Sequence, residues 1–320
     1  MFSLKNSRML TEARAAQRKP KLIFQLLLYL LVFYVTTSAS SIILLVPMIF
    51  AIFSNPAFMP AVKSGNISEA IAIANEMPTW LMLLNLFVTL CTTVLCIVYC
   101  RYIERRSLAS MGFTKKGWLV SYLKGFLIGS IMLFACAGIL YAMGALDFSF
   151  AKKIPIFYIL AFLLGFLVQG MSEEVMTRGY FMMSLSNRCH IAIAVAISSV
   201  VFSLMHLGNP GIKPLALLNI ALFGCFMAVY MLRTDDIWGA SAIHSAWNFM
   251  QGNFLGIQVS GTGHLPSVAV MQPMAGKELL NGGNFGIEGG LIVTAVTLLA
   301  IALTLFLPKR STEVPTEQEA

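Results

Sequence analysis

Long uncharged apolar runs recur along the chain, separated by short polar segments. Several reach or exceed the ~20 residues that a helix needs to cross the hydrocarbon core of a bilayer. The first run is longer than one crossing, but no polar turn divides it, so it predicts one long helix that Pro47 can kink. We therefore predict an all-α, polytopic transmembrane bundle of about eight helices, at 22–53, 79–100, 118–146, 154–185, 191–208, 214–232, 237–256 and 289–308.

The polar segments between these runs divide the chain into parts. We expect a basic N-terminal arm at 1–21, three helices with their loops at 22–153, a core with polar intramembrane residues at 154–256, a Gly-rich loop at 257–288, a final helix at 289–308 and a disordered tail at 309–320. The Gly-rich loop directly follows the most polar helix, so we expect that it can gate access to a site there.

The distribution of lysine and arginine predicts the orientation of the chain in the membrane. Only 11% of the 320 residues are charged, and the net charge is +8. Lysine and arginine gather in the arm 1–21, in the connector 101–116 and at the start of the tail, and such residues mark the cytoplasmic side. We expect a multi-pass protein with both termini cytoplasmic, in the plasma membrane if the source is bacterial. Topology and anionic membrane lipids explain the positive charge, and no nucleic-acid-binding motif accompanies it.

Ionisable residues inside the predicted spans are the most informative feature of the sequence. Inserting one such side chain at the centre of a membrane helix costs roughly 2.5–3.5 kcal/mol, so these residues usually mark a functional site. The fourth span contains Glu173, Glu174 and Arg178. Glu174 and Arg178 are four residues apart and can pair on one helix face. Glu173 is rotated by about 100° from Glu174. We therefore expect a structural ion pair and a second carboxylate that is free to face a cavity.

Two further motifs follow in later spans. Phe202 and His206 are four residues apart near the end of the fifth span, and His244 and Asn248 have the same spacing in the seventh. Counted from their shared connector, Glu173 and His206 lie at similar depths in the membrane. His244 fits less well, because it lies only eight residues beyond Asp236. Either the turn before it lies below the membrane surface, or the seventh helix begins elsewhere.

In this order, Glu-Glu-x-x-x-Arg, Phe-x-x-x-His and His-x-x-x-Asn resemble the motifs of the CAAX prenyl protease and bacteriocin-processing (CPBP) family, to which Ras-converting enzyme belongs. The resemblance covers roughly 154–256, which makes this segment the expected catalytic core. It implies an intramembrane endopeptidase whose substrate is a hydrophobic or lipid-modified peptide, either a CAAX-type C-terminus or a leader peptide such as that of a bacteriocin.

The resemblance also assigns roles to residues. Glu173 matches the catalytic glutamate, His206 the histidine that helps to hold and activate water, and His244 with Asn248 the residues that stabilise the oxyanion. Glu174 and Arg178 are supporting residues. The same atoms suit a metalloprotease, since two histidines and one carboxylate leave a zinc position open for water. In that version Glu173, His206 and His244 bind Zn²⁺ and Glu174 is a candidate base.

Two hypotheses from other functional classes remain. The bundle could be a non-enzymatic membrane scaffold or a bacteriocin self-immunity protein with the same fold. It could also be a transporter that relays protons through buried Glu and His side chains, although no inverted repeat is visible.

Overall fold

The computed structural model describes residues 7–75 and 77–306, and the predicted tail 309–320 lies outside them. Every predicted span corresponds to helix. Five helical runs are long and apolar enough to cross a membrane, and two further apolar helices are shorter. The α-helices are α1 (Arg8–Arg14), α2 (Leu22–Ser54), α3 (Phe58–Lys63), α4 (Ile67–Asn75), α5 (Thr79–Val88), α6 (Leu90–Val98), α7 (Trp118–Ala142), α8 (Ile156–Glu174), α9 (Met183–Leu185), α10 (Ile191–Leu204), α11 (Pro214–Thr234), α12 (Trp238–Phe249), α13 (Glu278–Asn281) and α14 (Leu291–Phe306).

π-Helical turns extend three of these helices. They cover Tyr99–Ile103 after α6, Val175–Met182 after α8 and Met250–Phe254 after α12. Such turns are rare and are often found at functional sites. Here, the second turn begins directly after Glu174 and the third begins two residues after Asn248.

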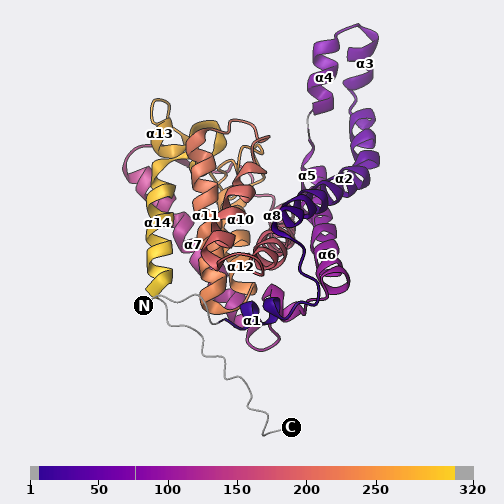
Figure 1. The fold of residues 1–320 in the computed structure, drawn as a ribbon. Helices are drawn as coiled ribbons and strands as arrows, with labels where there is room; N and C mark the ends of the chain where they lie inside the picture. Colours follow the sequence, from indigo (N-terminus) through magenta and orange to yellow (C-terminus); the bar gives the residue numbers. More distant parts are fainter. Residues whose placement is uncertain (1–6, 76, 307–320) are drawn as a thin grey trace.

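The helices form two groups with α8 between them (Figure 1). On one side α12 packs against both α7 and α8, α10 packs against α11, and α11 packs against α14. On the other side α2 packs against α5 and α6, which also contact α8. The helices α3 and α4 extend away from the body, in the segment that we expected to be a loop at 54–78. The long first helix is confirmed, with Pro47 inside it.

Small residues position α12, which carries the His-x-x-x-Asn motif. A Cβ atom at Gly125 of α7 would lie 2.2 Å from the carbonyl oxygen of Gly239, and one at Gly170 of α8 would lie 2.4 Å from the Ser245 hydroxyl. Without a Cβ, both neighbouring helices approach the α12 backbone closely, as small residues allow in membrane bundles. Helix α8 thereby lies near enough to α12 for the polar side chains of these two helices to meet.

The basic N-terminal arm folds back over the bundle. The backbone N–H groups of Arg8 and Met9 in α1 donate to the two carboxylate oxygens of Asp235, at 3.0 and 3.1 Å. Asp235 and Asp236 are both buried. The turn before α12 therefore lies inside the protein, beneath α1, which explains why His244 is only eight residues from it.

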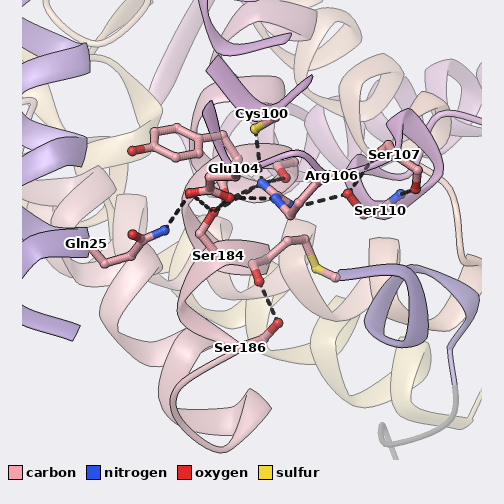
Figure 2. Close-up of polar contacts among 11 residues, drawn as sticks. Gln25, Cys100, Glu104, Arg106, Ser107, Ser110, Ser184 and Ser186 are labelled. Atoms are coloured by element: carbon pink, nitrogen blue, oxygen red, sulfur yellow. Dashed lines mark hydrogen bonds and ion pairs between the residues drawn. The ribbon is translucent and has the colours of Figure 1, made fainter. Parts of the chain in front are cut away.

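A buried polar cluster ties the connector after α6 to the bundle (Figure 2). Arg106 pairs with Glu104 at 2.6 Å, and neither side chain is more than 1% exposed. Gln25 of α2 donates to Glu104 at 2.8 Å, and Ser184 of α9 donates to it at 2.7 Å. Arg106 also reaches the Ser110 hydroxyl at 3.2 Å. Arg106 looked like a surface charge in the sequence but is a buried structural residue.

Two predicted helix ends were wrong. The third helix ends at Ala142 instead of 146, because Leu146–Phe150 forms strand β1, which pairs antiparallel with β2 (Ala269–Pro273). The Gly-rich loop therefore contains a strand, and also α13. The fifth helix ends at Leu204 instead of 208, so His206 lies in the turn after α10.

Candidate active site

A cavity of about 830 Å³ lies between the two groups of helices. Its walls come from α2, α5, α8, α11, α12 and the segment 259–265. The four side chains predicted as catalytic, Glu173, His206, His244 and Asn248, all line it. The fold thus brings together residues from three separate motifs.

The two adjacent glutamates occupy different environments. The Glu173 side chain is 25% exposed and lines the cavity, whereas Glu174 is completely buried. Glu174 pairs with Arg178 at 3.1 Å, which confirms the predicted i, i+4 ion pair. Glu173 lines the cavity, as expected for the second carboxylate.

His244 lies between these carboxylates. Its Nδ1 atom is 2.8 Å from Glu174 Oε1, and its Nε2 atom is 3.5 Å from Glu173 Oε2. A carboxylate accepts hydrogen bonds, so Nδ1 carries a proton that it donates to Glu174. The imidazole is therefore fixed in orientation, with Nε2 directed toward Glu173. The link between His244 and Glu174 could not be seen in the motif spacing.

Phe202 separates the two histidines and covers the arginine. Its ring centroid is 4.9 Å from that of His206 and 6.1 Å from that of His244. The guanidinium carbon of Arg178 lies 4.4 Å from the same centroid. This contact is a cation–π interaction, which favours a buried cation that has few hydrogen-bond acceptors. Phe202 therefore packs against site residues.

His206 lies in the turn after α10, where a backbone carbonyl orients its ring. Its Nδ1 atom is 2.9 Å from the Phe202 carbonyl oxygen, the acceptor that the end of α10 leaves free. Nδ1 therefore carries a proton that it donates to this oxygen, and Nε2 is not engaged by the carbonyl. The ring is oriented by backbone even though the helix has ended.

Gln169 is a site residue that the sequence analysis missed. Its amide nitrogen donates to Glu173 Oε1, and its carbonyl oxygen accepts a hydrogen bond of 3.0 Å from Asn248. This side chain connects α8 to α12 through Asn248 and holds one oxygen of Glu173. A signal was present, because Gln169 is a polar residue one helical turn before Glu173 inside an apolar span.

A third carboxylate, Glu288, also lines the cavity. It is the last residue of the predicted Gly-rich loop and accepts hydrogen bonds from the backbone N–H and the hydroxyl of Ser260, at 2.6 and 3.0 Å. Burial raises the pKa of the Glu288 carboxyl, while the bonds from Ser260 and the nearby His206 ring act in the opposite direction. No motif pointed to this residue, because it lies outside the predicted spans.

The zinc alternative for Glu173, His206 and His244 stays a prediction. In residues 7–75 and 77–306, no three His, Cys, Asp or Glu side chains are grouped to hold a metal ion. Both ring nitrogens of His244 face carboxylates, and Nδ1 of His206 faces a backbone carbonyl.

Fold and site together define a multi-pass membrane protein with a buried carboxylate–histidine centre. The family model described as type II CAAX prenyl endopeptidase Rce1-like matches residues 155–250, the segment that contains all three motifs. Over this segment the chain is similar to the Rce1-like family of membrane proteases, in agreement with the resemblance. No curated protein matches the chain. The match supports a CAAX-type intramembrane protease, in which a prenylated peptide is the expected kind of substrate.

Proposed function

We propose that the protein is an intramembrane endopeptidase that uses a water molecule activated by Glu173 to cleave a hydrophobic or lipid-modified peptide. The observation that carries the proposal is the placement of Glu173. Of the two adjacent glutamates, Glu173 is the one that is partly exposed. Gln169 and His244 each contact one of its two oxygens at the cavity wall.

In this mechanism Glu173 accepts a proton from water as the water oxygen attacks the peptide carbonyl carbon. The same carboxyl then gives the proton to the leaving amine nitrogen, so that the carboxylate is restored. A positioned general base of this kind contributes typically 10²–10⁴-fold to a rate. His206 Nε2 accepts the second hydrogen of the water and helps to orient it.

Two residues of α12 stabilise the oxyanion in this mechanism. The imidazolium form of His244, donating from Nε2, and the second amide hydrogen of Asn248 are the proposed donors for the developing negative charge. Glu174 fixes the orientation of the His244 ring, and Arg178 neutralises Glu174. These roles follow the family resemblance, and the contacts of His244 support them.

The cavity walls fit an apolar substrate. Besides the polar residues, the lining contains Phe33, Met82, Leu86, Phe162 and Phe166. Such a surface accommodates a hydrocarbon chain or a hydrophobic peptide that arrives from the bilayer. A prenylated CAAX-type C-terminus and a leader peptide, such as that of a bacteriocin, are the two substrate classes that we propose.

The test compares wild type with Glu173→Gln in lipid, using a prenylated CAAX-type peptide and a panel of leader peptides, with and without chelator. Glu278→Gln is the matched control, because Glu278 is a fully exposed carboxylate outside the cavity. Cleavage that Glu173→Gln abolishes and chelator leaves intact supports the proposed mechanism. Loss with chelator that zinc restores would replace it with the metalloprotease alternative. No cleavage by folded wild type would favour the scaffold or self-immunity function.

We also propose that both termini are cytoplasmic, on the basis of the lysine and arginine distribution. Single cysteines placed at Gln17 and Gly276 in a cysteine-free background should react with a membrane-impermeant thiol reagent from opposite sides. Labelling of both from the same side would overturn this orientation.

A further inference from the structure

A series of two hydrogen bonds runs along the cavity wall from Glu173 to Asn248. Gln169 Nε2 donates to Glu173 Oε1, and Asn248 Nδ2 donates to Gln169 Oε1 at 3.0 Å. All three side chains line the cavity. The series therefore joins the proposed base on α8 to a proposed oxyanion donor on α12.

The direction of both bonds follows from the charge of Glu173. An ionised carboxylate only accepts hydrogen bonds, so the amide of Gln169 must turn its NH2 group toward Glu173. The carbonyl oxygen of Gln169 then faces Asn248, and this oxygen requires the NH2 group of Asn248 on that side. Without a neighbour of fixed polarity, either amide could present its oxygen or its nitrogen at the same position.

We propose that Gln169 is a positioning residue, which transmits the polarity of the Glu173 carboxylate to the Asn248 amide. It keeps the NH2 group of Asn248 at the site, with one hydrogen bonded to Gln169 and the other available to the oxyanion. The inference rests on the proposed protease function. It makes the base and the oxyanion donor one connected unit instead of two independent groups.

Close packing of α8 against α12 makes this connection possible. Gly170 follows Gln169, and a Cβ atom at Gly170 would lie 2.4 Å from the hydroxyl of Ser245. Ser245 lies three residues before Asn248, so the two are neighbours on one side of α12. Asn248 is only 6% exposed, which leaves water little access to compete for its amide.

A link that only held the two helices together would behave differently. Its loss would lower the stability of the bundle and leave kcat per folded molecule unchanged. A link that orients an oxyanion donor acts in the transition state, so its loss should lower kcat more than it changes KM.

The experiment measures kcat and KM in lipid for wild type, Gln169→Met, Asn248→Ala and the double variant. The probe is the prenylated CAAX-type peptide or the leader peptide that wild type cleaves in a Glu173-dependent manner. Methionine has a similar length to glutamine but no amide. Gln272→Met is the matched control, because Gln272 is an exposed glutamine of β2 outside the cavity.

Gln169→Met should lower kcat by about 10- to 100-fold and change KM by less than about three-fold, whereas the control should match wild type. Asn248→Ala should lower kcat by about 100-fold. In the Asn248→Ala background, Gln169→Met should cost about five-fold less than it does in wild type, because the donor that it orients is absent.

A second variant covers the case in which Gln169→Met does not fold. Gln169→Asn keeps the amide but is one methylene shorter, so it cannot reach Glu173 and Asn248 together. It should give the same loss of kcat and the same reduced cost in the Asn248→Ala background.

An unchanged kcat in a folded Gln169 variant would overturn the inference. So would a loss that appears only in KM, or losses that multiply fully in the double variant. Each of these results leaves the protease function intact. Failure of the proposed function looks different, because cleavage by wild type would then not depend on Glu173.

Discussion

Residues 7–75 and 77–306 contain two buried Glu–Arg pairs, and these pairs differ in how completely they are hydrogen-bonded. In the connector pair, Glu104 accepts bonds from Gln25 and Ser184 in addition to Arg106 (Figure 2). Arg106 donates to Ser110, to the sulfur of Cys100 and to backbone carbonyls of the Val175–Met182 turn. Both members of this pair have several partners.

The pair behind the cavity is less complete. Among the described residues, Glu174 Oε2 and the Nε and Nη2 atoms of Arg178 have no hydrogen-bond partner. Arg178 relies on the ring of Phe202 instead, and Glu174 shares its other oxygen with His244. Buried polar groups without partners are costly, and they are retained most often where function requires them. The difference indicates that the connector pair serves stability, whereas the second pair serves the site.

The largest effect should come from the carboxylate that faces the cavity. Glu173→Gln removes the proposed base but keeps a side chain of the same size. We expect kcat/KM to fall about 10³-fold or more with little change in the melting temperature. Single-turnover cleavage assays and thermal unfolding in lipid check both parts. An active Glu173→Gln protein would show that another group activates the water.

Breaking the connector pair should instead affect folding. Arg106→Met leaves Glu104 buried without its cation, and removal of one partner of a buried pair costs about 3–5 kcal/mol. We expect a large decrease in the free energy of unfolding, measured by denaturant titration in mixed micelles. The neighbouring exposed Arg105→Met is the control and should be close to wild type. Comparable losses in both variants would contradict a special role for the pair.

An intermediate effect should follow from Glu174→Gln. The amide still fills the space but loses the charge that holds His244 Nδ1 and neutralises Arg178. A hydrogen bond to a charged group contributes about 1.5–3 kcal/mol, so cleavage should decrease by roughly 10- to 100-fold. The same assay as for Glu173 measures it. A loss of stability as large as in Arg106→Met, with unchanged activity per folded molecule, would remove the distinction between the two pairs.

The smallest effect should come from the edge of the connector cluster. Gln25→Met removes one hydrogen bond to Glu104, while Ser184 and Arg106 remain. We expect a destabilisation of about 1.5 kcal/mol and unchanged kcat/KM. Denaturant titration and the cleavage assay, run side by side, check this. Any change in activity greater than the loss of folded protein would link the connector cluster to catalysis.

Much of the architecture could be predicted because long apolar runs have few alternatives in a membrane. The spacing of Glu174 and Arg178 also predicted their contact, since four residues form about one helical turn. Arg106 was misread because a charge in a basic connector looks like a topology signal until Glu104 folds against it. Gln169 could have been found, as a polar residue one turn before Glu173. Glu288 could not, because Ser260 and Asn219 meet it only in the folded chain.

The β1–β2 pair has a consequence for the order of folding. β1 is synthesised before α8, and β2 is synthesised after α12, with Phe150 opposite Ala269 in the register. The two strands can therefore pair only when every helix that carries a site motif has already been inserted. Closing such a long loop is slow compared with forming helices. The strand pair is thus a late step of biogenesis, and a chain truncated before Ala269 would contain all three motifs without this closure.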